Sequence, residues 1–200
     1  NTVIASDFSA NRRKLAERGG ADIVINPAQN SPFENWKELG LLGDAAEALN
    51  YGLGLFDKLQ ATGIPWWHAW RVADKLGALP KRPVIFECVG VPGILQQIID
   101  GAPLLSKIIG VGVCMQSDRI EPALAINKEI EMQFVLGYTP LEFRDALHMI
   151  AEGKIDCTPL ITGIVGLDGV INAFSALRDP ESHAKILVDP KKVGSEISKK

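Results

Sequence analysis

The first residues that could do chemistry are one carboxylate and two guanidinium groups behind it. Asp7 ends a short apolar run of β type, and Arg12 and Arg13 follow in a stretch of helical character, NTVIASDFSANRRK. An acid at the tip of a parallel strand can bind the two hydroxyls of a ribose and would repel a phosphate on that sugar, whereas the arginines would favour a phosphate. We weight the acid more heavily because its charge would lie against the 2′ oxygen, which favours NAD over NADP. A turn cap at Asp7 with solvated arginines is the alternative and stays open.

Glycines form the second group, because they let a ligand approach the backbone closely. Gly90 ends VIFECVG, Gly110 and Gly112 interrupt IIGVGV, and Gly137 follows QFVL. Any tight turn from a strand into a loop would use the same glycines. The pattern alone therefore leaves a binding role and a turn role open.

Cysteine and histidine are too scattered to predict a metal centre. Cys88, Cys114 and Cys157 form no CxxC pair, which argues against a zinc knuckle or a disulfide framework and favours a reducing, cytoplasmic location. The three histidines have no second ligand at zinc-like spacing; they are His68, His148 and His183. We assign no catalytic residue and no metal ligand.

Short apolar runs alternate with helical patterns along most of the chain. The runs predict strands at 3–6, 23–25, 84–89, 108–114, 131–136 and 185–188. The helical patterns are at 11–18, with Ser9 as N-cap, and at 95–105, 141–151 and 170–177. Most runs are continuously apolar, as in strands covered on both faces, so we predict an α/β chain with a mostly parallel sheet.

Composition excludes some partners. The 200 residues carry a formal net charge of −3, without the basic excess that a nucleic-acid surface needs. No window offers the ~18 apolar residues of a membrane span. We therefore expect no nucleic-acid partner and no membrane insertion.

Residues 28–82 break the alternation, since no confident strand occurs there. This stretch holds all four tryptophans, three of them in GIPWWHAWRV, and residues 41–59 and 66–76 could both be helices. Three interpretations stay open: helices packed against the sheet, a subunit contact or lid, and a membrane-surface anchor.

Four segments, in this order, resemble the zinc-type medium-chain alcohol dehydrogenases: VIFECVG, IIGVGV, EIEMQFVLGYTPLEFRDALHMIAEGKID and SHAKILVD, together with the Asp7 segment. The resemblance implies a cofactor site for NAD in which Asp7 holds the adenosine ribose and Arg12 flanks it. It implies further cofactor-binding residues on the adenine side, along the nicotinamide, near the carboxamide and at the pyrophosphate. These are, in that order, Cys88, Val89 and Gly90; Val111, Gly112 and Val113; Leu136 and Gly137; and Lys185.

Parts that the family needs are not found in these residues. No G-x-G-x-x-G follows a strand, and GLGLF at 52–56 lacks the third glycine. In the family, the first strand with its phosphate-binding turn lies just before the point where this sequence starts, and the zinc ligands lie in an N-terminal domain. We therefore expect a longer protein, with zinc held only in that other domain.

The expected fold is an incomplete doubly wound (Rossmann) parallel sheet that lacks its first strand and has an inserted helical segment. Residues 1–27 and 83–155 would form the partial dinucleotide-binding domain. Residues 28–82 would be the insert, and residues 156–200 would return toward a catalytic domain.

The function that follows is the cofactor-binding portion of an NAD-dependent alcohol or polyol dehydrogenase. It would act on a small alcohol or carbonyl compound, as a homo-oligomer, and this portion alone would be inactive. The alternatives are a zinc-free quinone or enoyl reductase of the same superfamily, and a non-catalytic nucleotide-binding or assembly module.

Overall fold

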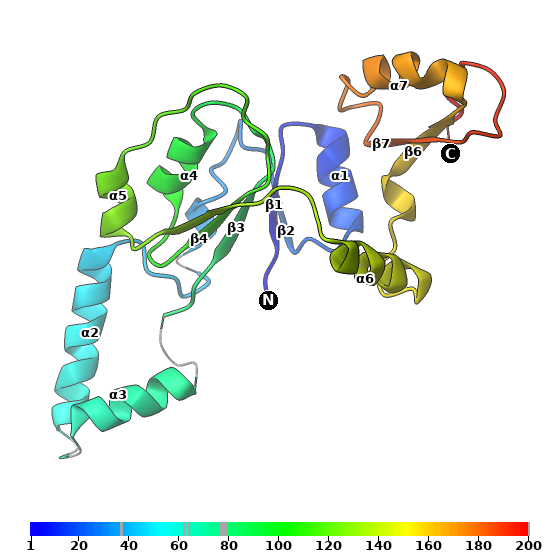
Figure 1. The fold of residues 1–200 in the computed structure, drawn as a ribbon. Helices are drawn as coiled ribbons and strands as arrows, with labels where there is room; N and C mark the ends of the chain where they lie inside the picture. The colour runs from blue at the N-terminus through cyan, green and yellow to red at the C-terminus, as the bar shows by residue number, and fades with distance from the viewer. Residues whose placement is uncertain (37, 62, 64, 77–79, 200) are drawn as a thin grey trace. The chain divides into compact units, whose positions relative to one another are not determined.

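The computed structural model describes residues 1–36, 38–61, 63, 65–76 and 80–199, which fall into two compact units (Figure 1). One unit, here called the split unit, consists of Asn1–Pro32 and Tyr138–Lys200. The other, here called the central unit, is the continuous stretch Phe33–Gly137.

The central unit is built on a three-stranded parallel sheet. Its strands are β3 (Val84–Glu87), β4 (Lys107–Gly110) and β5 (Glu131–Phe134), in the order β3-β4-β5. The connections pass through α4 (Ile94–Gly101) and α5 (Pro122–Asn127). Parallel strands end at the same edge, so the residues after β3, β4 and β5 are brought together.

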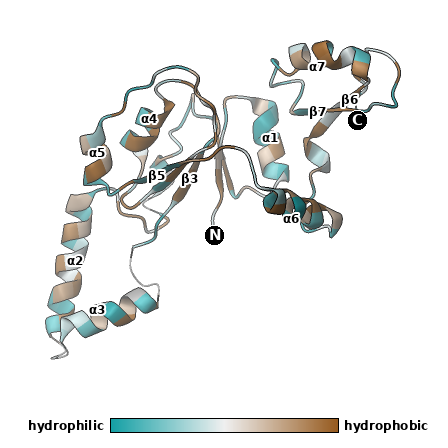
Figure 2. Ribbon diagram, viewed as in Figure 1, coloured by the Kyte–Doolittle hydropathy of each residue, from teal (hydrophilic) through white to brown (hydrophobic). Residues whose placement is uncertain are grey.

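One face of this sheet carries the core. Ile85, Ile108 and Met132 are paired across the three strands, and they pack with Ile98 and Ile99 of α4. The neighbouring positions on β3 are open, with Val84 52% and Phe86 65% exposed, and Figure 2 shows β3 as a largely hydrophobic strand. The prediction of strands covered on both faces is therefore wrong for β3 as the structure has it.

The remaining elements of the central unit are helical. They are the 3₁₀ turn η1 (Glu34–Trp36), α2 (Ala45–Gln60) and α3 (Trp66–Lys75). Asp44 caps α2 by accepting the N–H of Glu47 at 2.8 Å. No residue of α2, all of which the structure describes, is buried. The three interpretations of the insert and the proposed domain limits remain predictions.

The split unit contains two pairs of parallel strands. The first is a β-α-β unit made of β1 (Ile4–Ser6), α1 (Ala10–Arg18) and β2 (Ile23–Ile25). Ser9 caps α1 as predicted, since its Oγ accepts the N–H of Arg12 at 3.1 Å. Gly20, at φ +90°, turns the chain after the helix in a backbone conformation that residues other than glycine rarely adopt.

The second pair of strands lies in the C-terminal part of the split unit. It joins β6 (Ile161–Val165) to β7 (Lys185–Val188), with α7 (Val170–Ala176) between them. Val165, Ala173 and Ile186 form its buried core. The other elements are α6 (Pro140–Ala151) and the 3₁₀ turns η2 (Thr158–Leu160) and η3 (Leu167–Gly169).

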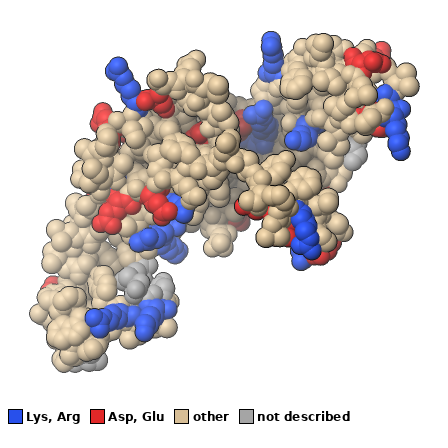
Figure 3. All heavy atoms as spheres, viewed as in Figure 1, with Lys and Arg blue, Asp and Glu red and all other residues tan. Residues whose placement is uncertain are grey.

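The strands β2 and β7 have the predicted bounds, whereas the predicted strands 84–89, 108–114 and 131–136 end two to four residues early, at Glu87, Gly110 and Phe134. Neither β6 nor α5 is among the predicted elements. No helix among the described residues is long and apolar enough to cross a membrane. On the face drawn in Figure 3, side chains of both charges are interspersed.

Candidate functional site

A buried carboxylate shapes the turn after β3. Glu87, the last residue of the strand, is only 5% exposed. Its Oε1 accepts the backbone N–H groups of Val89 at 2.6 Å and of Gly90 at 2.7 Å. These two donors have no strand partner, and the carboxylate satisfies both. Gly90 completes the turn at φ +69°.

The same residue joins the turn after β3 to the turn after β4. The carbonyl oxygen of Glu87 accepts the N–H groups of Val111 and Gly112, each at 2.8 Å. A Cβ on Gly112 would lie 2.3 Å from the nitrogen of Gly90, and one on Gly90 would lie 2.6 Å from the nitrogen of Val113. Glycine is therefore required on both sides, because the two backbones touch.

This contact brings together six of the predicted site residues at the carboxyl ends of two adjacent strands. They are Cys88, Val89 and Gly90 in one turn and Val111, Gly112 and Val113 in the other. Val89 and Val113 are exposed by 63% and 69%, so apolar side chains stand beside bare backbone. Such a surface suits the flat face of a ring, which needs close approach and apolar contact.

Two further predicted residues follow the third strand of the same sheet. Leu136 is 95% exposed, and Gly137 turns the chain at φ +65°. The N–H of Val135 bonds to the carbonyl oxygen of Gly110 at 3.1 Å, which places this segment beside the end of β4. Eight predicted residues thus lie at one edge of the central unit.

The thiol of Cys88 is an ordinary, unactivated one. Partial burial, and then the negative charge of Glu87, raise the pKa of Cys88. A raised pKa keeps the group as a thiol near neutral pH, whereas a nucleophile or a metal ligand must be a thiolate. Cys88 is therefore not expected to act as a nucleophile or as a metal ligand.

The predicted acid after β1 lies in the split unit and is half-buried. Asp7 accepts the N–H of Ser9 at 2.8 Å through Oδ1, which is the turn cap considered from sequence. Within the described residues its Oδ2 has one partner, Nη1 of Arg12 at 3.8 Å, and the Asp7 side chain is 37% exposed. One oxygen therefore holds the turn, while the other can still accept a hydrogen bond from a ligand.

The two arginines behind Asp7 have different partners. Arg13 donates from Nη1 to the carbonyl oxygens of Asp7 and Phe8, at 2.8 Å each, so its fork stabilises the turn. Nη1 of Arg12 lies 3.8 Å from Oδ2 of Asp7, and its predicted place beside the ribose stays a prediction. Lys185 lies on β7 with an exposed side chain that makes no ion pair among the described residues.

A second acid, not predicted from sequence, meets the same turn. Glu181 accepts the N–H of Ala10 at 3.0 Å and that of Asn11 at 3.1 Å. The hydroxyl of Ser9 and the backbone N–H of Asn11 lower the pKa of Glu181, so it is ionised near neutral pH. No local signal marks this residue, since it lies 171 positions from Ala10 along the chain.

Glu87 was also missed, although a signal was present. It is an acid at the end of the apolar run VIF, with a glycine three residues later. A carboxylate there can accept the N–H groups of the turn that the glycine makes possible. Glu87 and Gly90 therefore form the turn together, since the glycine allows its backbone conformation and the carboxylate accepts its N–H groups.

No metal centre is formed by the described residues, which contain no group of three histidine, cysteine or acidic side chains able to hold an ion. His183 is buried with its Nδ1 3.3 Å from Oγ1 of Thr162, and His148 lies exposed on α6. These residues do not fit a catalytic zinc ion, so no chemistry of zinc is assigned to them.

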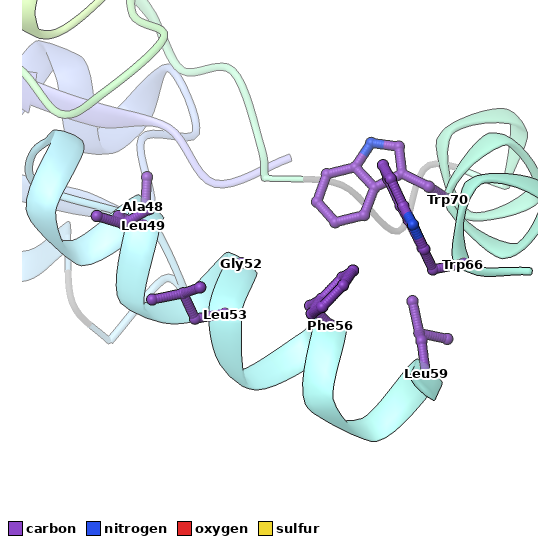
Figure 4. A pocket seen from close by; sticks show the side chains of 8 residues that line it. All are labelled: Ala48, Leu49, Gly52, Leu53, Phe56, Leu59, Trp66 and Trp70. Carbon is purple, nitrogen blue, oxygen red and sulfur yellow. The ribbon is translucent and has the colours of Figure 1, made fainter. Parts of the chain in front are cut away.

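An apolar hollow lies in the helical hairpin of α2 and α3. It has a volume of about 310 Å³ and an apolar lining, with Phe56 and Trp66 facing each other at 5.7 Å between ring centres (Figure 4). The lining offers no titratable group, so this groove suits apolar contact and not acid–base chemistry.

Comparison with family models gave no match. Among curated proteins, the chain is similar to (R,R)-butanediol dehydrogenase of Bacillus subtilis (strain 168), with 32% identity over 108 residues. That match covers 54% of this chain and 31% of the relative. The chain spans less than half the length of the curated relatives it matches.

Solved structures share the fold. An alcohol dehydrogenase from E. coli CFT073, complexed with NADH, has a TM-score of 0.66 at 19% identity and covers 94% of this chain and 44% of its own. A zinc-binding dehydrogenase from Sinorhizobium meliloti 1021, bound to NADP, has a TM-score of 0.64 at 22% identity, covering 95% and 45%. The predicted α/β class with a Rossmann-type parallel sheet is confirmed.

Proposed function

We propose that the chain is the cofactor-binding portion of an NAD-dependent alcohol dehydrogenase of the medium-chain type, which its similarity to butanediol and sorbitol dehydrogenases supports. The reaction is oxidation of a small primary or secondary alcohol. A bound nicotinamide would accept the hydride from the carbinol C–H bond, and the hydroxyl proton would be released to solvent. The products are a carbonyl compound, NADH and a proton.

The observation that carries this proposal is the pair of joined turns after β3 and β4. In open α/β sheets, ligands bind at the carboxyl ends of the strands. Here the backbones of Gly90 and Gly112 touch, Glu87 fixes both turns, and two valines stand exposed beside them. The residues present therefore fit a nicotinamide cofactor that lies over Val111–Val113.

Asp7 supports NAD as the preferred cofactor. Its exposed Oδ2 can accept a hydroxyl of the adenosine ribose, and its charge would repel a 2′-phosphate. NAD supplies the hydride acceptor when bound. The residues of this chain bind it, orient the ring and exclude water from one face; none of them is assigned a proton transfer or a metal.

The test of this function uses the whole protein that contains the chain. NAD binding is measured by titration calorimetry, and NADH formation is followed by absorbance with vicinal diols and sugar alcohols as substrates. We expect NAD to bind, and Asp7→Asn to weaken it by about 10- to 100-fold, because a hydrogen bond to a charged group is worth roughly 1.5–3 kcal/mol.

Asp168→Asn is the matched control, because Asp168 is an exposed acid of the same unit, on η3. It should leave NAD binding unchanged. No NAD binding by the unaltered protein would overturn the proposed function, as would equal losses in the two variants.

A further inference from the structure

Three consecutive backbone N–H groups at the start of α1 are bound by carboxylates. The N–H of Ser9 is bound by Asp7, and those of Ala10 and Asn11 are bound by the two oxygens of Glu181. The next donor, the N–H of Arg12, is bound by the Ser9 hydroxyl. The end of a helix that usually attracts anions thus has its donors in use.

Glu181 is held in this position by its own turn. Its N–H donates to Oδ1 of Asp179 at 3.0 Å, and the Ser9 hydroxyl donates to the carbonyl oxygen of Pro180 at 3.2 Å. The turn is therefore fixed to α1 at its backbone as well as through the carboxylate. An acid held at several points is a fixed part of the surface around α1.

The location matters because α1 follows Asp7 directly. A ribose bound at Asp7 would place its 2′ oxygen near the first turn of α1. NADP has a phosphate on that oxygen, and helix N-terminal N–H groups and arginine forks are the groups that bind phosphate best. Here the N–H groups of Ala10 and Asn11 are bound by Glu181, Nη1 of Arg13 donates to two carbonyl oxygens, and Nη1 of Arg12 lies 3.8 Å from Oδ2 of Asp7.

We propose that Glu181 is a specificity-determining residue that rejects NADP by occupying the anion-binding end of α1. The inference rests on the proposed function and adds a second acid to it. Asp7 selects the ribose hydroxyls, whereas Glu181 takes up the donors that a 2′-phosphate would need and adds a negative charge beside them. Removing Asp7 alone would then leave much of the discrimination in place.

The test measures kcat/KM for NAD and for NADP on the whole protein, with Glu181→Gln as the variant. The amide keeps the size of the side chain but loses the charge and one acceptor. We expect the ratio of NADP to NAD efficiency to rise about 10-fold, which corresponds to roughly 1.4 kcal/mol, with the NAD value changed by less than about twofold. The double variant with Asp7→Asn should raise the ratio further than either change alone.

Glu17→Gln is the matched control, because Glu17 is an exposed acid in the last turn of the same helix. Glu17→Gln removes one negative charge at the far end of α1 from Glu181, and it should not change the ratio of NADP to NAD efficiency. A binding readout accompanies the kinetics: 2′,5′-ADP should gain affinity over 5′-ADP in Glu181→Gln and not in Glu17→Gln.

The outcomes separate this inference from the proposed function. NAD binding by the unaltered protein together with an unchanged ratio in Glu181→Gln would overturn the role of Glu181 and leave the function standing. A parallel fall for both cofactors would show that Glu181 only stabilises α1, which also overturns the inference. If neither cofactor binds the unaltered protein, the two proposals fail together.

Discussion

Two acids end parallel strands in this chain, and they are used in opposite ways. Glu87 after β3 is 5% exposed, and one of its oxygens accepts two backbone N–H groups. Asp7 after β1 has a side chain that is 37% exposed, and only Oδ1 accepts a backbone N–H. Similar sequence contexts, an apolar run followed by an acid, therefore give a structural carboxylate in one case and a ligand-accessible one in the other.

The two acids differ in exposure because their turns offer the backbone N–H groups different numbers of other acceptors. The turn after β3 is followed by no helix-capping side chain, and a second backbone lies against it, so the N–H groups of Val89 and Gly90 take Glu87 as their acceptor. The turn after β1 leads into α1, where Ser9 and Glu181 supply the other acceptors. Asp7 is thereby left with an oxygen for a ligand.

The sharpest test of this comparison is to remove each acid. Glu87→Ala removes a buried carboxylate that accepts two part-buried N–H groups, and we expect a loss of about 2–4 kcal/mol of unfolding free energy. Asp7→Ala should cost less than about 1 kcal/mol, because its turn is open to water. Urea denaturation of both variants gives the two numbers. Glu87→Gln keeps an acceptor for both donors and should recover most of the loss, whereas equal losses in the two alanine variants would contradict the assigned roles.

A second test addresses the contact that Glu87 maintains. Gly112→Ala places a methyl group where the nitrogen of Gly90 is 2.3 Å away, so backbone must move, at a cost of about 1–3 kcal/mol. Gly54→Ala is the control, since Gly54 lies within α2 and no atom lies within 4 Å of its added Cβ. That change should stabilise by about 0.5–1 kcal/mol, because alanine favours a helix.

Gly112→Ala also links stability to function. If the joined turns are the floor of the cofactor site, this variant should lose NAD affinity, while Gly54→Ala should not. Unchanged NAD binding in a folded Gly112→Ala protein would show that the contact between Gly90 and Gly112 is not part of the cofactor site.

Local sequence patterns were sufficient to predict strand bounds where the apolar run ends at the same residue as the strand. β2 and β7 were predicted to the residue, because each apolar run is bounded by polar residues or turns. β4 was predicted too long, because Val111 to Cys114 remain mostly apolar after Gly110, while the N–H groups of Val111 and Gly112 already bond to Glu87. β6 was missed because Gly163 interrupts the apolar run ITGIV.

The candidate site shows the same limit. The eight residues after β3, β4 and β5 were named from the family resemblance, and the structure places them just after the strand ends, which local patterns had put two to four residues later. Whether Asp7 faces solvent could not, since this depends on how many other acceptors its turn receives. Glu181 reaches α1 from the other end of the chain, and only tertiary structure reveals such a contact.

The smallest expected effect is a dependence on pH confined to the exposed acids. The nearby Ser9 hydroxyl and the backbone N–H of Asn11 lower the pKa of Glu181, and the Ser182 hydroxyl lowers that of Asp179. A lowered folded-state pKa gives stability that is complete above the ordinary carboxyl range and is lost as pH falls through the lowered value. Amide exchange at Ala10 and Asn11 should therefore lose protection as pH falls below the ordinary carboxyl range, after correction for intrinsic rates. In Glu181→Gln one of the two amides should lose its protection, and the protection that remains should change much less with pH; a variant as pH-dependent as the unaltered chain would show that another group controls this end of α1.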